Sequence, residues 1–298
     1  MNLKLTRRQF GQVAIATTVV AAVGTLVNKT LAQTPSSDIL GLVVGSTTTD
    51  DSATPEIEST ENIEQTTSQA VAVSTQPLVV QSLNRGSILT TAPILEFGEQ
   101  ITGFAVLKDG TYVVATTSTT DKKADQPTRL VILGASPKTL TISGLKKKET
   151  IIDLFTRKDG SLGALVGKRN GTPPISIVSI NAQTGQITDK DKLSGNVRVT
   201  TISECPDGNL YGISVNRKGE TSLVQINKGK DQTTPLSFNA QPWNSGFSGL
   251  VCSSSNELFA LGARRYESPK YLHAINKSTG VITRIKDFDV ARIAISLG

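Results

Sequence analysis

The side chains that most often carry catalysis are scarce in this chain of 298 residues, which has one histidine and two cysteines. These numbers exclude His-cluster metal sites, zinc ribbons and multi-disulfide scaffolds. The sequence also contains no Walker loop, dinucleotide-binding glycine loop or EF-hand. His273 stands in an apolar strand pattern between Tyr271 and Ile275, which is typical of a structural histidine rather than of the base of a nucleophilic triad. We therefore expect no metal, no cofactor and no catalytic histidine.

Three acids, Asp153, Glu204 and Asp289, fall in segments that we expect to form the innermost strands of a repeated unit. Glycoside hydrolysis generally uses two facing carboxylates, but Asp153 and Glu204 do not hold equivalent positions in their units. A solvated acid near the end of a strand is the favoured interpretation of Asp153. A hydrolase or lyase that acts on a carbohydrate or lactone is the alternative hypothesis for function, and we assign no catalytic residue.

Cys205 and Cys252 lie 47 residues apart in a chain whose repeat is about 48 residues long. They are therefore one residue out of register, and a one-residue offset turns a side chain to the opposite face of its sheet. Export to an oxidising compartment favours a disulfide, whereas bridging requires Cβ atoms about 3.8 Å apart. The sequence leaves open whether these two cysteines pair.

Pairs of basic residues recur along the chain at spacings of 46, 49 and 47 residues. Each pair follows the second strand of its unit, so four successive units carry a pair in the same loop. Tyr266 and Trp243 are the aromatic side chains expected near these loops. Clustered charge of one sign attracts anions and accelerates their encounter, although solvated loops also tolerate Lys and Arg without any function. The pairs are Lys122-Lys123, Lys168-Arg169, Arg217-Lys218 and Arg264-Arg265.

The elements that must position these residues form a repeat. Apolar strands run into turns whose spacings are 50, 48 and 48 residues, and a second apolar strand follows each turn. This pattern is typical of β-hairpins, and a further turn recurs once in every unit. Each unit therefore holds four short strands, which is the size of one β-propeller blade. The hairpin turns are Asp109-Gly110, Asp159-Gly160, Asp207-Gly208 and Ser255-Asn256.

We predict an all-β fold, a five-bladed β-propeller that covers residues 77–298. The fifth blade is expected to take its innermost strand from residues 291–296 and its outer strands from residues 77–95. Its second strand is either Ile39–Val44 or Ala70–Ser74. Pairing of N- and C-terminal strands closes the ring and removes free sheet edges. A β-sandwich or an open repeat array is the alternative architecture.

Two recurring strings carry a resemblance. Leu-Tyr-Gly-Ile occurs at 210–213, and Ile-Asn-x-x-Thr-Gly-x-Ile-Thr occurs at 180–188 and 275–283. They resemble the repeats of exported bacterial β-propeller proteins over roughly residues 77–298. This resemblance implies an architecture rather than an activity, because such repeats occur in binding proteins and enzymes alike. Propellers with a quinone cofactor share the Thr-Gly turn but repeat a Trp in their blades, and the single Trp243 argues against that cofactor.

Residues 1–32 resemble a twin-arginine export signal. Arg7, Arg8 and Phe10 precede an apolar stretch of about 15 residues, which is short for a membrane span of about 20. Ala32 completes a cleavage site, and an N-terminal anchor helix is the alternative interpretation. We expect an exported protein, in the periplasm or another compartment outside the cytoplasm, with no transmembrane segment after removal of the signal.

The formal net charge of +6 is distributed unevenly along the chain. Residues 33–76 carry a net charge of −7, are rich in Thr and Ser and contain no aromatic residue. Such a segment cannot bury enough apolar surface to offset its ordering entropy, so we interpret it as a largely disordered tether. Residues 77–298 carry a net charge of +9.

The first hypothesis is an exported, non-enzymatic binding or scaffold protein that docks an anionic partner through a basic propeller face. An anionic polysaccharide, a lipid headgroup or an acidic protein is expected, rather than nucleic acid, because the protein is exported and aromatic residues are few. A purely structural component of the cell envelope is a third hypothesis.

Overall fold

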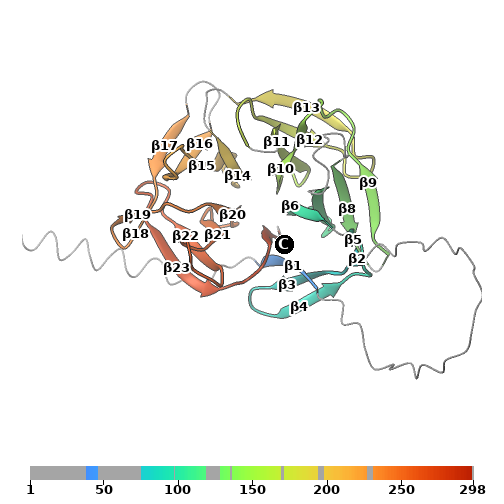
Figure 1. Cartoon of the computed structure of the whole chain (residues 1–298), viewed down its shortest axis with the longest axis horizontal. Coiled ribbons are helices and arrows are strands. Elements are labelled where there is room, and N and C mark those ends of the chain that lie inside the picture. The colour runs from blue at the N-terminus through green and yellow to red at the C-terminus, as the bar shows by residue number, and fades with distance from the viewer. Residues whose placement is uncertain are drawn as a thin grey trace, which may run out of the picture. The chain divides into compact units, whose positions relative to one another are not determined.

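The computed structural model describes residues 38–45, 75–96, 98–118, 128–134, 136–168, 171–193, 198–226 and 231–296. Within these ranges the chain is all-β, without a helix, and it forms five four-stranded sheets and two small two-stranded ones. The five large sheets surround a common axis as the blades of a β-propeller (Figure 1). The five-bladed propeller predicted from the repeat is confirmed.

Four blades are continuous in sequence, and their strands pair antiparallel in chain order from the axis to the rim. The first blade is β6 (Glu99–Val106), β7 (Tyr112–Ser118), β8 (Arg129–Leu133) and β9 (Lys138–Thr141). The second is β10 (Glu149–Thr156), β11 (Leu162–Lys168), β12 (Ser176–Ile180) and β13 (Ile187–Lys192). The third is β14 (Val199–Glu204), β15 (Leu210–Val215), β16 (Thr221–Ile226) and β17 (Gln232–Pro235). The fourth is β20 (Phe247–Cys252), β21 (Leu258–Gly262), β22 (Tyr271–Ile275) and β23 (Ile282–Asp287).

The fifth blade is assembled from both ends of the described chain, in the order β24-β1-β3-β4. Its innermost strand is β24 (Arg292–Ile295), its second strand is β1 (Ile39–Val44), and its outer strands are β3 (Leu78–Ser82) and β4 (Gly86–Thr90). Of the two segments proposed for the second strand, Ile39–Val44 takes the place, and Ala70–Ser74 lies outside the described residues. The propeller therefore draws one strand from within the segment 33–76 that we interpreted as a tether.

Two short pairs of strands lie outside the blades. β2 (Thr75–Gln76) pairs with β5 (Leu95–Glu96), and β18 (Ser237–Phe238) pairs with β19 (Gln241–Pro242). The repeat gave no indication of either pair, because their residues fall in the connections between blades.

The ring is closed around the axis. Innermost strands of successive blades contact one another in the order β6, β10, β14, β20 and β24, and β24 contacts β6 again. The hydrophobic core lies between neighbouring sheets, with separate clusters of buried side chains between the blades. Closure of this kind rules out the open array and the sandwich considered above.

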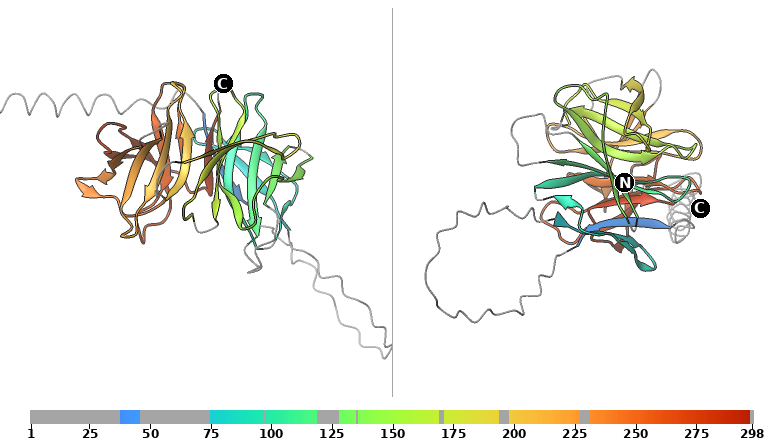
Figure 2. Two further views of the ribbon diagram at one scale, coloured as in Figure 1. Left: turned by 90° about the horizontal axis from the view of Figure 1, so that it is seen from above. Right: turned by 90° about the vertical axis from the view of Figure 1, so that its right-hand side faces the viewer.

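Strands run along the propeller axis, so the connections gather at two ends (Figure 2). Asp-Gly turns join the first and second strands of the first three blades, and we call the end that carries them the turn end. The opposite end carries the connections from the second to the third strand and from one blade to the next, and we call it the loop end.

The innermost strand carries the same β-bulge in four blades. Its register shifts between Ile101 and Gly103, Ile151 and Asp153, Val199 and Thr201, and Phe247 and Gly249. In three of these blades the hydroxyl of the bulged residue donates to a carbonyl of the second strand, over 3.2–3.4 Å. A bulge bends its strand and redirects the next side chain. The residues that follow the bulges are Gly103, Asp153, Thr201 and Gly249.

Candidate functional site

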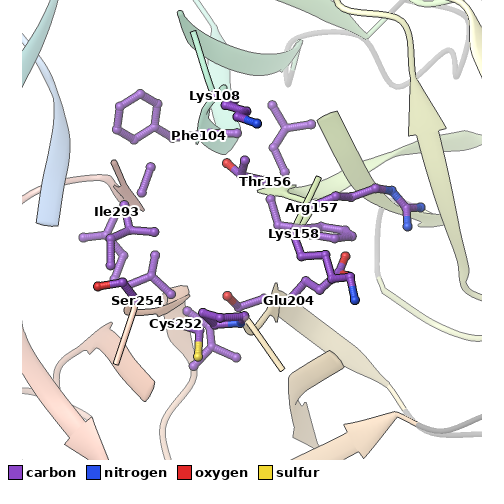
Figure 3. A pocket seen from close by; sticks show the side chains of 18 residues that line it. Phe104, Lys108, Thr156, Arg157, Lys158, Glu204, Cys252, Ser254 and Ile293 are labelled. Carbon is purple, nitrogen blue, oxygen red and sulfur yellow. The ribbon is translucent and has the colours of Figure 1, made fainter. Parts of the chain in front are cut away.

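A pocket of about 440 Å³ opens on the axis at the turn end (Figure 3). The last residues of all five innermost strands line it, from Phe104 of β6 to Ile295 of β24. Figure 3 shows Arg157, Lys158 and Glu204 on the side opposite Phe104 and Ile293. The pocket therefore has a charged wall and an apolar wall.

The Asp-Gly turns hold the two lysines of the pocket in place. Each turn Asp accepts a hydrogen bond from the backbone amide two residues later, as Asp159 does from Ser161 at 2.9 Å. Formation of this turn is sufficient to explain why Asp occurs at these positions. Gly160 and Gly208 have φ values of +85° and +82°, and a Cβ at either would meet the side chain of Lys108 (2.3 Å) or Lys158 (3.2 Å) from the preceding blade. The turn glycines thus leave the space in which these lysines lie.

Glu204 and Arg157 are the other charged residues of the pocket. Glu204 Oε2 and Arg157 Nε are buried and have no hydrogen-bond partner among the described residues. Burial raises the pKa of the Glu204 carboxyl, and the positive charge of Arg157 opposes that rise. The Arg157 guanidinium lies 5.7 Å from the centre of the Phe155 ring. An unpartnered donor and an unpartnered acceptor therefore lie in one wall.

A buried polar layer lies deeper along the axis than the pocket. Asp153, only 4% exposed, accepts hydrogen bonds from Thr201 Oγ1, from the Ile202 amide (3.1 Å) and from the Leu154 amide (3.0 Å). Burial raises its pKa to about 6, against the opposing charge of Arg292. The expectation of a solvated acid near a strand end is therefore wrong, because the bulge turns Asp153 toward the axis.

Arg292 occupies the same position in β24 that Asp153 occupies in β10. Its guanidinium donates to the carbonyls of Ser248 (2.6 Å) and Ile101 (3.2 and 3.3 Å), which belong to the innermost strands on either side. Arg292 thus ties β24 to β20 and β6, and Asp153 ties β10 to β14. Sequence reasoning missed Arg292, although it falls in the strand that was predicted to close the ring.

Cys205 and Cys252 form a disulfide with Cα atoms 5.2 Å apart, and it joins the third and fourth blades at the turn end. The one-residue offset that seemed to argue against pairing is what allows it. Neighbouring blades pack face to face, so the two side chains must leave opposite faces of equivalent strands to meet. Cys252 also lines the pocket.

The described residues of the basic pairs lie on connections of the loop end. Lys168, Arg217, Lys218 and Arg265 are exposed, and none of them forms an ion pair with a described residue. Lys122, Lys123 and Arg169 lie outside the described residues. Whether these residues bind a partner remains a prediction.

Some other cations of the described chain form ion pairs, whereas exposed lysines of the turn end such as Lys108, Lys138 and Lys158 form none with a described residue. Arg129 bridges Glu96 and Glu99, and Lys190 lies 2.7 Å from Glu149. Arg284 contacts Glu267 at 3.1 Å. Of the predicted pairs, Arg264 differs from the rest, because its guanidinium covers the Phe238 ring at 4.7 Å and donates to the Phe238 carbonyl.

The two aromatic candidates lie in different surroundings. Tyr266 is 93% exposed, and the Arg265 guanidinium lies 5.2 Å from its ring centre. Trp243 is 1% exposed and stacks on Phe247 at 5.0 Å. The expectation that Trp243 forms part of a surface is therefore wrong, because the connection after β19 turns its indole into the core.

His273 is fully buried and lies edge-on to the rings of Trp243, Phe247, Phe238 and Tyr271. Burial lowers its pKa to about 4, and the charge of Arg284 adds to the effect. It does not line the axial pocket. This placement agrees with the structural role predicted for it.

The carboxylates considered for catalysis do not converge. Glu204 lines the axial pocket, whereas Asp153 is buried beyond it. Asp289 was expected on an innermost strand, but it is exposed in the connection before β24, where it accepts a bond from the Lys270 amide at 3.4 Å. Glu204 is thus the one carboxylate among the described residues that line the pocket.

No cluster of metal-binding side chains occurs in the parts of the chain that the structure describes. The predicted signal residues Arg7, Arg8, Phe10 and Ala32, like most of the segment 33–76, lie outside those parts. Within them, no helix is long and apolar enough to cross a membrane.

No protein-family profile matches the sequence, and no curated protein matches it. Solved structures share the fold at low identity. A Bacteroides caccae protein of unknown function is 11% identical over 88% of this chain and 100% of its own, with a TM-score of 0.45. A protein of unknown function from Dyadobacter fermentans is 12% identical over 73% of this chain and 74% of its own (TM-score 0.49). A virginiamycin B lyase from Staphylococcus aureus is 16% identical over 70% of this chain and 62% of its own (TM-score 0.40). At such values these likenesses say nothing of this chain's function.

Proposed function

We propose that this protein is an exported, non-enzymatic binding protein that docks an anionic partner through the cations of its loop end. The proposal rests on four exposed cations that have no ion-pair partner among the described residues. Lys168, Arg217, Lys218 and Arg265 lie on equivalent connections of three successive blades and have no carboxylate partner among the described residues. Arg129, Lys190 and Arg284 are neutralised by acids, but exposed lysines of the turn end are unpaired too. The repetition on equivalent connections is therefore what distinguishes the four loop-end cations.

The positive potentials of unpaired cations on adjacent loops add together. They raise the local concentration of anions, and their attraction weakens as salt screens it over about 10 Å at 0.1 M. A repeating polyanion gains most from such an arrangement, because it can contact several loops at once. An anionic polysaccharide is therefore the first candidate, and a lipid headgroup or an acidic protein would use the same charges.

Export supports this choice of partner. The twin-arginine pattern with Arg7 and Arg8 directs the chain out of the cytoplasm, and the Cys205–Cys252 disulfide is typical of proteins in oxidising compartments. Nucleic acid is scarce in such compartments.

The test is binding of polygalacturonate to the chain from residue 33 onward, with neutral dextran as the control polymer, at 20 and 300 mM salt. A loop-end variant, Lys168→Ser/Arg217→Ser/Lys218→Ser, is compared with a turn-end variant, Lys108→Ser/Lys138→Ser/Lys158→Ser. Both remove three exposed cations, so their net charges are equal. We expect the loop-end variant to bind about tenfold more weakly at low salt, and the turn-end variant to change less than twofold.

Equal losses in the two variants would show that net charge alone matters and would contradict the proposal. So would binding that does not change with salt. Binding of anionic vesicles or acidic proteins with the same loop-end dependence, in place of polygalacturonate, would keep the surface and change the partner.

A hydrolase or lyase acting on a carbohydrate or lactone at the axis is the second candidate. The specific observation in its favour is Glu204, whose raised pKa suits a general acid or base and which lies in the pocket with Arg157. Against it stands the absence of a second carboxylate among the described lining residues. Turnover of a lactone or glycoside that is lost in Glu204→Gln would establish this candidate.

A further inference from the structure

The axial pocket has the dimensions and chemistry of a site for a small molecule. Its volume of about 440 Å³ lies within the range of pockets that enclose metabolites and drug-sized ligands. Apolar side chains line it from four different blades, namely Phe104, Leu154, Leu250 and Ile293. Such a lining favours a ligand with an apolar body.

Its charged wall carries more positive than negative charge. Lys108, Arg157 and Lys158 line the pocket together with one carboxylate, Glu204. Lys108 and Lys158 lie over the turn glycines of the next blade, at the rim of the pocket. The excess of positive charge favours a ligand with a single anionic group.

Two polar atoms of that wall have no partner among the described residues. Arg157 Nε is a buried donor, and Glu204 Oε2 is a buried acceptor that becomes a donor when the carboxyl is protonated. Buried polar atoms rarely remain unsatisfied in a folded protein. A ligand group in the pocket would satisfy Glu204 Oε2, either by donating to it or by accepting from it when the carboxyl is protonated.

The pocket is separate from the surface of the proposed function. It opens at the turn end, whereas Lys168, Arg217 and Lys218 lie on connections of the loop end, and Asp153 and Arg292 lie between the two ends without lining the pocket. A ligand at the pocket therefore has no need of the loop-end cations.

We propose that the axial pocket binds a small organic acid with an apolar body. Its carboxylate lies against Lys108 and Lys158 at the rim, and its apolar part lies against Phe104 and Ile293. This is a second binding site, which takes a different class of ligand from the polymer proposed for the loop end.

The test uses the fluorescent probe 8-anilinonaphthalene-1-sulfonate, which combines an apolar body with one anionic group. The protein used is the chain from residue 33 onward. Bound probe is displaced from this protein by 4-phenylbutyrate or by 4-phenylbutan-1-ol, which share an apolar body but differ in charge. We expect the acid to compete at least tenfold better than the alcohol. Equal competition, or no saturable binding of the probe, would overturn the proposal.

Variants then locate the site. Lys108→Gln/Lys158→Gln changes two exposed rim residues, and we expect it to weaken 4-phenylbutyrate about five- to tenfold while leaving the alcohol unchanged. Ser254→Phe fills the mouth from an exposed position and is expected to weaken both competitors. The matched control Lys168→Gln/Lys218→Gln removes the same charge from the loop end and should change neither.

Folding of each variant is followed through Trp243, the only tryptophan of the chain, which is buried away from the pocket. Unchanged binding of 4-phenylbutyrate in a folded Ser254→Phe variant would overturn the proposal. A loss in the loop-end control equal to that in the rim variant would overturn it as well. Because polygalacturonate is measured separately, either site can fail while the other stands.

Discussion

The two ends of the propeller axis use charge in opposite ways. At the turn end, Arg157 and Glu204 are partly buried beside an apolar pocket, and their unpartnered atoms lie at fixed positions. At the loop end, Lys168, Arg217 and Lys218 are exposed on connections between strands. A few desolvated charges can select one ligand by geometry, whereas many solvated charges attract any polyanion and lose their effect in salt. One fold thus offers a selective site and a permissive surface.

The layer between the two ends gives the largest expected effect. Arg292→Met leaves the carbonyls of Ser248 and Ile101 without this donor, at about 1–3 kcal/mol each, and removes the positive charge that favours the Asp153 carboxylate. The double variant Asp153→Asn/Arg292→Met should recover only the electrostatic part of that loss. Denaturant unfolding of Arg292→Met, Asp153→Asn and the double variant measures the coupling energy between the two residues. Additive losses would mean that the layer does not act as a unit.

The disulfide is the next test, and it concerns the turn end alone. A loop of 47 residues closed by Cys205–Cys252 is expected to stabilise the fold by about 3–4 kcal/mol. Cys205→Ala/Cys252→Ala should lower the unfolding free energy by that amount, and reduction of the unchanged protein should do the same. Reductant should not affect the double variant. Weakened polygalacturonate binding in this variant would mean that the two ends are not independent.

Two buried groups make stability respond to pH in opposite directions. Asp153 takes up a proton in the folded state near pH 6 and in the unfolded state only near its ordinary value of 3.8, so acidification from pH 7 to 4 stabilises the fold through this group. His273 resists protonation down to about pH 4, whereas the unfolded chain accepts the proton near 6.5, so the same acidification destabilises the fold.

Each contribution is about 2–3 kcal/mol across its window. Between pH 7 and 4, Asp153→Asn should therefore lose more stability than the unchanged protein, and His273→Phe should lose less. Urea unfolding at pH 7, 5.5 and 4 separates the two. Parallel pH profiles in all three proteins would contradict both assignments.

A matched pair of glycines tests how the turn end holds its lysines. Gly110 and Gly160 have φ values of +83° and +85°, but only at Gly160 would a Cβ collide with a neighbour, Lys108. Gly110→Ala should cost about 1 kcal/mol from backbone strain, and Gly160→Ala about 2 kcal/mol. Binding of 4-phenylbutyrate should weaken only in Gly160→Ala. Equal effects would show that Lys108 does not depend on this glycine.

The smallest expected effect lies at the loop end. Lys168→Ser/Arg217→Ser/Lys218→Ser should change the unfolding free energy by less than about 0.5 kcal/mol, because exposed cations without ion pairs contribute little to stability. The same variant is expected to lose polyanion binding. A large loss of stability would mean that these residues serve the fold, and the contrast between the two ends would disappear.

The repeat made the fold predictable, but it did not reveal the site. Hairpin turns such as Asp159-Gly160 have local sequence signatures, and their regular spacing predicted five blades and the closing strand. The axial pocket has no such signature, because its walls come from single residues at the ends of five strands, such as Phe104, Glu204 and Ile293. Trp243 was misplaced for a related reason, since its position depends on an irregular connection that no repeat describes.

The composite fifth blade makes the fold sensitive to the order in which the chain is synthesised. Ile39 pairs with Ile295, so the second strand of this blade emerges from the ribosome long before its inner neighbour exists. Until then β1 presents an unpaired edge, and the ring stays open. Completion of the last strand therefore closes the ring. A chain that stops short of β24 lacks the Arg292 bonds to both neighbouring blades, and proteases would meet it as an open sheet rather than a closed ring.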